Sequence, residues 1–329
     1  MKKIAILGAG TWGLALARQL SLGGNQVTVW SALEEEINLL NSTKVHPNLP
    51  KMQIPTAIQF TKSLEDACME KEILLFAVPS VYVRSTAAKV RPFAKEGQII
   101  VNVAKGIEAE TLMSMTQIIE QELEKVLPMV ALSGPTHAEE VALDLPTAIV
   151  SASEDLSAAK QVQSLFADTC MRVYTNQDIA GVELCGAMKN IIALAAGISA
   201  GLHYGDNTKA ALITRGMAEI TRLGLAMGCQ EQTFSGLAGI GDLIVTATST
   251  HSRNNRAGFL IGQGYSPKEA IKEIGMVVEG INALPAAVKL AEHHQVEMPI
   301  ISAIDAVVRH GADPAETVRR LMERDQKAE

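Results

Sequence analysis

The sequence predicts an α/β protein in which a doubly wound parallel sheet is followed by an all-helical domain. Short runs rich in Val, Ile and Leu alternate with helical stretches in the first half of the chain, as is typical of strands buried on both faces. The first run leads into a glycine-rich turn that opens a helix. After about residue 177 only helical patterns follow. We therefore expect one domain over residues 1–177 and a second over residues 178–329.

The composition excludes several classes of protein. A chain of 329 residues with 47% apolar and 20% charged residues is suited to two packed domains. The 29 Lys and Arg against 36 Asp and Glu give a net charge of -7, so we expect no nucleic-acid partner, which would favour a basic surface. The longest uncharged apolar runs fall short of the ~20 residues of a membrane span, which argues against an integral membrane protein.

The cysteines and histidines indicate neither a disulfide framework nor a metal site. The four cysteines include no CxxC pair, and the seven histidines show no HExxH spacing. We expect no metal, and thiols kept reduced in the cytoplasm.

Eight strands are expected in the first domain, because each run is short and apolar. They are Lys3–Leu7, Gln26–Trp30, Thr56–Phe60, Ile73–Val78, Gln98–Val103, Met129–Leu132, Thr147–Ser151 and Arg172–Tyr174. Helices are expected between them at Trp12–Leu22, Ser80–Val90, Thr111–Glu122 and Asp155–Phe166. Because strands and helices alternate, the strands should run parallel.

The second domain shows helices only. Four long ones are expected at Asp178–Ala200, Asp206–Met227, Val278–His293 and Pro299–His310. Two further helix starts, Ser266-Pro267 and Asp313-Pro314, each combine an N-cap residue with a proline in the first turn.

A GxGxxG motif, Gly8-Ala9-Gly10-Thr11-Trp12-Gly13, joins the first strand to the first helix. Gly8 permits the tight turn, Gly10 lets the backbone approach a pyrophosphate, and Gly13 lets the helix pack closely. The helix N-terminus offers N–H groups and a positive dipole end to phosphates. The motif favours a Rossmann-type dinucleotide site over a purely structural turn.

The second strand lacks the usual residue for the adenosine ribose. It ends in Val29-Trp30-Ser31-Ala32-Leu33, without a carboxylate or an arginine. Glu34, Glu35 and Glu36 follow and are typical of a solvated first helical turn.

The helix expected over Asp178–Ala200 is apolar nearly all round, so it should be buried. Its charges are Glu183 and Lys189, which lie on different faces because they are six residues apart. Lys189 could protonate a carbonyl oxygen as a hydride reaches the carbon. The alternative, a lysine that snorkels at the helix rim, is equally compatible with this stretch.

Further polar groups cluster in four segments: Lys105-Gly106, Ser133–Ala138, Gly239–Leu243 and Ser249–Asn254. The first two follow strands and should lie at the carboxyl edge of the sheet, where such folds bind ligands. Arg253, Asn254 and clustered backbone N–H groups suit a phosphate or carboxylate. The alternative for the last segment is an ordinary helix start, capped by Ser252 with Arg253 on the surface.

Six ordered motifs cover nearly the whole chain: Gly8–Gly13, Val103–Glu108, Leu132–Glu140, Gly186–Ala193, Gly239–Asp242 with His251–Asn254, and Gly275–Gly280. Together they resemble the bacterial NAD(P)-dependent glycerol-3-phosphate dehydrogenases. The resemblance implies reversible reduction of dihydroxyacetone phosphate to sn-glycerol 3-phosphate with NAD(P)H, for glycerophospholipid synthesis. It also implies a dinucleotide-binding first domain and a second domain for substrate and catalysis.

The resemblance assigns roles to individual residues. Lys189 matches the proton-transfer lysine of the family. Substrate-contacting positions match Lys105, Gly134, Thr136, Lys189, Asp242, Ser252, Arg253 and Asn254. Coenzyme-contacting positions match Gly8, Gly10, Thr11, Trp12, Gly13, Lys105, Ala138, Arg253, Val277 and Glu279.

One segment departs from the family. Ala32-Leu33 stands where many members have His-Arg against the adenosine phosphate, so we expect NADH to serve at least as well as NADPH. Two other functions stay open: a related dehydrogenase of a carboxylated substrate, and a non-catalytic dinucleotide sensor. A homodimer is one assembly compatible with the sequence.

Overall fold

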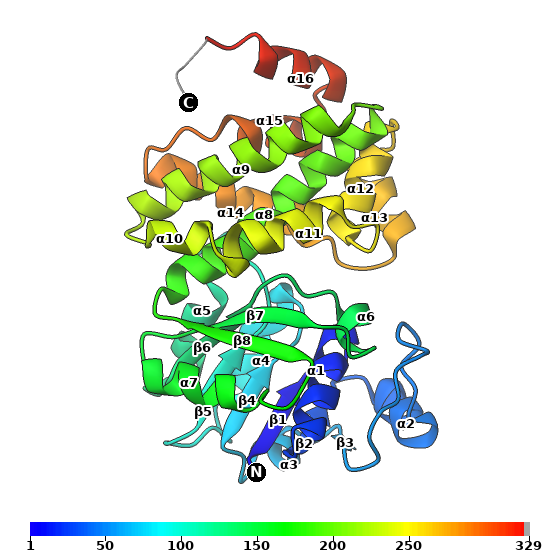
Figure 1. The fold of residues 1–329 in the computed structure, drawn as a ribbon, viewed down its shortest axis with the longest axis vertical. Coiled ribbons are helices and arrows are strands. Elements are labelled where there is room, and N and C mark those ends of the chain that lie inside the picture. Colours follow the sequence, from blue (N-terminus) through cyan, green and yellow to red (C-terminus); the bar gives the residue numbers. More distant parts are fainter. Residues whose placement is uncertain (326–329) are drawn as a thin grey trace. The chain divides into compact units, whose positions relative to one another are not determined.

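The structure, a computed structural model, describes residues 1–325. Contacts divide the chain into two compact units. The N-terminal unit comprises residues 1–105 and 113–183, and the helical unit comprises residues 106–112 together with 184 onward. Figure 1 shows the sheet in the first and helices alone in the second.

The N-terminal unit is built on one eight-stranded sheet in the order β3-β2-β1-β4-β5-β6-β7-β8. The strands are β1 (Lys3–Leu7), β2 (Gln26–Trp30), β3 (Gln59–Thr61), β4 (Ile73–Phe76), β5 (Ile99–Asn102), β6 (Met129–Ser133), β7 (Thr147–Ala152) and β8 (Met171–Asn176). All eight predicted strands are present. The third begins three residues later than expected, at Gln59.

The predicted all-parallel sheet is wrong at one pair, because β6 and β7 run antiparallel. The connection between them contains a single helical turn, α6 (Ala138–Val141). A parallel connection needs a crossover long enough to traverse the sheet, usually a full helix. One turn does not suffice, so the chain returns antiparallel, and β8 then pairs parallel with β7.

Helices cover both faces of the sheet. They are α1 (Thr11–Leu22), α2 (Glu34–Thr43), α3 (Leu64–Cys68), the 3-10 turn η1 (Ser80–Tyr82), α4 (Val83–Val90), α5 (Met115–Leu123) and α7 (Leu156–Ser164). Alternate residues of β1 enter different cores: Ile4 and Ile6 pack on one face, and Ala5 and Leu7 on the other. Burial on both faces explains why this strand shows no polar alternation.

The helical unit is formed by α8 (Ile179–Gly201), which begins in the preceding unit, α9 (Asp206–Ala226), α10 (Glu231–Phe234), the π turn η2 (Leu237–Gly241), α11 (Asp242–Thr248), α12 (Arg253–Gly262), α13 (Pro267–Ile274), α14 (Glu279–His293), α15 (Pro299–His310) and α16 (Pro314–Met322). The predicted N-caps Ser266 and Asp313 are confirmed, since each side chain accepts a backbone N–H of the first turn.

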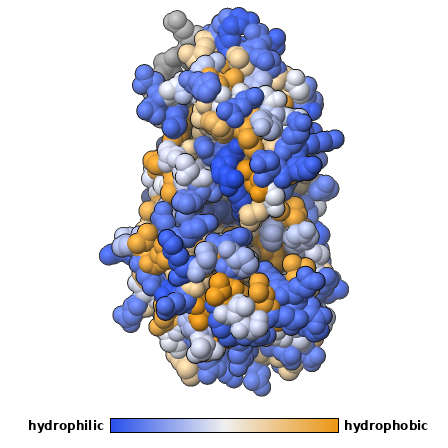
Figure 2. All heavy atoms as spheres, turned by 90° about the vertical axis from the view of Figure 1, so that its right-hand side faces the viewer, coloured by the Kyte–Doolittle hydropathy of each residue, from blue (hydrophilic) through white to orange (hydrophobic). Residues whose placement is uncertain are grey.

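Helix α8 is the core of the helical unit. It is long and apolar enough to cross a membrane, but 89% of its most apolar window is buried inside the structure. It crosses α12 at very close range: a Cβ on Gly197 would lie 2.0 Å from the Asn255 carbonyl oxygen, and one on Gly258 would lie 2.1 Å from that of Leu194. The surface face drawn in Figure 2 is predominantly hydrophilic, with apolar side chains in separate small patches.

Candidate functional site

The glycine loop between β1 and α1 has the geometry of an anion cradle. Gly8 has a φ of +129°, and a Cβ there would lie 2.8 Å from the Ala77 backbone. A Cβ on Gly13 would lie 2.2 Å from the Gly8 carbonyl oxygen, so α1 packs directly on the turn. A Cβ on Gly10 would meet nothing within 4 Å, which leaves that backbone open.

The N-terminus of α1 has no side-chain cap and no acidic residue in its first turn. Thr11 and Trp12, both half-buried, begin the helix here. Such a helix end presents N–H donors and a partial positive charge to an anion. The loop therefore fits the pyrophosphate of a dinucleotide, and its fit rests on backbone groups.

The segment after β2 carries acidic rather than basic side chains. Ser31 donates its hydroxyl to Glu36 at 2.5 Å, and Ala32 and Leu33 are exposed. Glu34, Glu35 and Glu36 form the first turn of α2, as expected. Lys62, just after β3, forms an ion pair with Glu34 at 2.5 Å, so this cation is engaged by a carboxylate.

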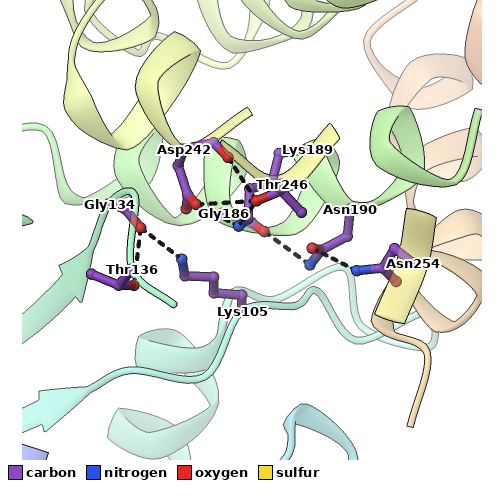
Figure 3. Close-up of polar contacts among 9 residues, drawn as sticks. All are labelled: Lys105, Gly134, Thr136, Gly186, Lys189, Asn190, Asp242, Thr246 and Asn254. Carbon is purple, nitrogen blue, oxygen red and sulfur yellow. Dashed lines mark hydrogen bonds and ion pairs between the residues drawn. The ribbon is translucent and has the colours of Figure 1, made fainter. Parts of the chain in front are cut away.

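At the ends of β5 and β6 the predicted residues Lys105, Gly134 and Thr136 converge. Lys105 Nζ donates to the Gly134 carbonyl oxygen at 3.2 Å, and Thr136 Oγ1 donates to the same oxygen at 3.1 Å (Figure 3). Gly134 has a φ of +155°, and a Cβ there would lie 3.1 Å from the Ile149 Cα, so a larger residue would strain this turn. Ala138, half-buried, begins α6 directly afterwards.

In the helical unit Lys189 is buried and paired. Its side chain is 7% exposed, and Nζ lies 2.5 Å from Asp242 Oδ1 and 2.6 Å from Thr246 Oγ1 (Figure 3). The snorkelling alternative is therefore wrong. Sequence reasoning missed Thr246, although it lies four residues after Asp242 and hence on the same face of α11.

A second polar group joins α8, α12 and α14. Asn254 donates to Asn190 Oδ1 at 3.0 Å and accepts from the Gly280 backbone N–H at 2.8 Å. The Asn254 amide is thus held in place by two protein partners. Asn190 was missed by sequence reasoning, because an amide gives no charge signal in an apolar helix. A Cβ on Gly280 would lie 2.5 Å from the Asn190 carbonyl oxygen.

At the start of α12 the expected helix cap and the exposed arginine are both present. Ser252 caps the helix by accepting the Asn255 N–H at 3.2 Å, and Arg253 is exposed beside it. Val277 and Glu279, predicted as coenzyme contacts, are half-buried at the start of α14. Among residues 1–325 no cluster of His, Cys, Asp or Glu is arranged to hold a metal ion.

Comparisons with known proteins cover both units. Residues 3–159 match the family described as NAD-dependent glycerol-3-phosphate dehydrogenase N-terminus, and residues 178–319 match the corresponding C-terminus. A Lactobacillus delbrueckii subsp. bulgaricus protein named glycerol-3-phosphate dehydrogenase of the NAD(P)+ type is 62% identical, over 100% of this chain and 99% of its own. One of the same name from Agathobacter rectalis is 50% identical, over 100% and 98%.

A solved structure agrees with these matches. The glycerol-3-phosphate dehydrogenase of Coxiella burnetii has a TM-score of 0.94 and 37% identity, over 98% of this chain and 99% of that one. The glycine loop, the buried lysine and the full-length similarity lead to one conclusion: this chain belongs to the NAD-dependent glycerol-3-phosphate dehydrogenase family.

Proposed function

We propose that this protein catalyses the reversible reduction of dihydroxyacetone phosphate to sn-glycerol 3-phosphate with NAD(P)H. The observation that carries the proposal is the buried Lys189, held by Asp242 and Thr246 in a helix that otherwise packs as core. Burying a charged lysine is costly unless its charge is compensated, so its presence in this core requires a reason. Family membership, supported by the relatives named above, supplies that reason.

Lys189 is the proposed proton donor. Asp242, only 1% exposed, stabilises the ammonium form of Lys189, and Thr246 orients Nζ by accepting a second hydrogen bond. The nicotinamide coenzyme, when bound, supplies the hydride. As negative charge develops on the substrate carbonyl oxygen, Lys189 Nζ stabilises it and donates the proton; the reverse reaction returns the proton to Lys189.

Arg253 is the proposed phosphate ligand. It is exposed at the first turn of α12, where the backbone N–H groups of the helix end add a partial positive charge. The remaining proposed substrate contacts are Lys105, Gly134, Thr136, Asp242, Ser252 and Asn254. The Asn254 amide binds Asn190 and the Gly280 N–H, and its second Nδ2 proton is the group proposed to contact the substrate.

The proposed coenzyme contacts are Gly8, Gly10, Thr11, Trp12, Gly13, Lys105, Ala138, Arg253, Val277 and Glu279. The open backbone at Gly10 and the uncapped α1 support the loop as the pyrophosphate site. We assign coenzyme binding to residues 1–177, and substrate chemistry chiefly to residues 178–329. We further propose a cytoplasmic homodimer that serves glycerophospholipid synthesis; the four cysteines, which form no disulfide, support the reducing location.

Substrate comparison tests the proposal against both alternatives. Purified protein with NADH or NADPH should reduce dihydroxyacetone phosphate and leave carboxylated ketones such as pyruvate unchanged. Faster turnover of the carboxylated ketone than of dihydroxyacetone phosphate would favour a dehydrogenase of carboxylated substrates. Coenzyme binding without NAD(P)H oxidation in the presence of any ketone would favour a non-catalytic dinucleotide sensor.

A further inference from the structure

Glu183 is a buried carboxylate whose role the proposed chemistry leaves open. It is 7% exposed and accepts four hydrogen bonds, all from uncharged donors of the N-terminal unit. No cation pairs with it among residues 1–325. Burial raises the pKa of the Glu183 carboxyl, while the hydrogen bonds it accepts oppose that shift. Burying a carboxylate without a cation costs folding free energy, so the presence of Glu183 at this position requires an explanation.

Part of the explanation is structural. Ser114, the N-cap of α5, donates its hydroxyl to Glu183 at 2.5 Å, and Thr116 donates its backbone N–H at 3.0 Å as well as its hydroxyl. The carboxylate thus lies against the N-terminus of α5, where negative charge is favourable. If this were its whole role, losing Glu183 would only destabilise α5.

The fourth hydrogen-bond donor to Glu183 comes from outside α5. Asn102, the last residue of β5, donates its amide to Glu183 Oε1 at 3.2 Å. The same amide brackets Ala104: Nδ2 donates to the Ala104 carbonyl oxygen at 2.9 Å, and Oδ1 accepts the Ala104 N–H at 3.0 Å. Asn102 therefore fixes both backbone groups of the residue before Lys105.

The chemistry of a carboxylate determines how Asn102 is oriented. A carboxylate only accepts, so it requires Nδ2 of Asn102 to face it and leaves Oδ1 for the Ala104 N–H. Reversing the amide would place two acceptors together at Glu183, and Ala104 would lose its acceptor. The direction of the backbone at Ala104, and so the starting point of the Lys105 side chain, follows from the acceptor oxygen that Glu183 presents to Asn102.

The ammonium end of the Lys105 side chain is constrained as well as its backbone. Its Nζ contacts the carbonyl oxygen of Gly134, whose left-handed turn is closed in by Ile149. With the acceptor fixed by the sheet, a shift of the Ala104 backbone would not be followed by Gly134. We propose that Glu183 is a positioning residue which, through Asn102 and Ala104, holds Lys105 for substrate binding; the inference rests on the proposed role of Lys105.

Substitutions along this chain of contacts test the proposal. Glu183→Leu removes every acceptor, and Asn102→Ala removes the link while leaving Glu183 its α5 donors. Each should lower kcat/KM for dihydroxyacetone phosphate about tenfold, mainly through KM, with kcat changed less than threefold. Glu183→Gln can turn its one oxygen toward Asn102 and Thr116 N–H and its NH2 toward the two hydroxyls. It should therefore restore most of the lost kcat/KM.

Ser114→Ala is the matched control, because it removes a Glu183 donor and the α5 cap without touching Asn102. It should lower the melting temperature and leave kcat/KM within about twofold of wild type. NADH affinity, measured by fluorescence titration of each variant, separates coenzyme from substrate effects; we expect the larger change for the phosphorylated ketone.

A double-variant cycle decides the matter. In a Lys105→Ala background, neither Glu183→Leu nor Asn102→Ala should lower kcat/KM further. An undiminished loss in that background would overturn the proposal, as would equal losses from Ser114→Ala and Asn102→Ala. If Glu183→Leu fails to fold, Asn102→Ala alone carries the cycle. Turnover by the wild-type protein tests the proposed function separately, since it does not depend on Glu183.

Discussion

Replacing Lys189 with Met should separate the chemical role of this lysine from its structural one. The substitution removes the Lys189 ammonium from Asp242, which is 1% exposed and also accepts a hydrogen bond from the Thr246 hydroxyl. Two effects follow: a general acid is lost, and a buried charge loses its counter-ion. A second substitution, Asp242→Asn, removes that buried charge as well.

The expected magnitudes differ for the two effects. Breaking a buried ion pair by removing one partner costs about 3–5 kcal/mol of unfolding free energy. For a helical unit of roughly 150 residues, that lowers the melting temperature by about 6–20 °C. Loss of the general acid should lower kcat at least ~10²-fold, with KM for dihydroxyacetone phosphate little changed.

The assay combines calorimetry with steady-state kinetics for Lys189→Met and for the double variant Lys189→Met/Asp242→Asn. The double variant should regain most of the lost melting temperature, because a neutral amide replaces the buried carboxylate, and should stay as inactive as the single variant. Near wild-type turnover in folded Lys189→Met would refute the proton-donor assignment. Recovery of activity in the double variant would show that stability, and not proton transfer, limited the single one.

Three further outcomes are expected. Arg253→Ala should weaken the binding of dihydroxyacetone phosphate by about 1.5–3 kcal/mol and that of unphosphorylated dihydroxyacetone much less. Equal losses for the two ketones would show that Arg253 does not bind the phosphate. NADH should serve at least as well as NADPH, because Ala32 and Leu33 offer no cation to a 2′-phosphate and Lys62 is paired with Glu34. Leu33→Arg and Glu34→Gln should each shift the ratio of the two kcat/KM values toward NADPH. A strong preference of the wild-type protein for NADPH would contradict this reasoning. Burial raises the pKa of Glu219 to about 7, so the folded state holds its proton where the unfolded state has lost it; unfolding free energy should fall by up to about 3 kcal/mol as pH rises from roughly 4.5 to 7, and Glu219→Gln should flatten that fall in urea titrations.

The fold was largely predictable because burial leaves a direct record in the sequence. Strands covered on both faces, such as β4 and residues 4–7 of β1, are apolar throughout, and the capping residue and proline of a helix such as α13 mark its first turn. The antiparallel pairing of β7 with β6 produces no distinct pattern of apolar residues in the sequence. Strand direction depends on whether the connecting segment can cross the sheet, and the single turn of α6 does not show in an apolar pattern.

The candidate site was predictable where charge or glycine stands in unusual company. Lys189 stood out because it is a cation in an apolar helix, and Gly8, Gly10 and Gly13 because of their spacing. The missed residues, Thr246 and Asn190, are neutral and frequent in ordinary helices, and only their partners reveal their use. The contact between Glu183 and Asn102 joins residues 81 positions apart, so no local pattern could contain it.

The most direct test of the account is the oxidation of NADH and of NADPH by the purified wild-type protein, followed by absorbance with dihydroxyacetone phosphate as the ketone. We predict saturable oxidation with formation of sn-glycerol 3-phosphate, and a kcat/KM with NADH at least equal to that with NADPH. Absence of oxidation with either coenzyme, in protein shown to be folded and to bind the coenzyme, would contradict the proposed function.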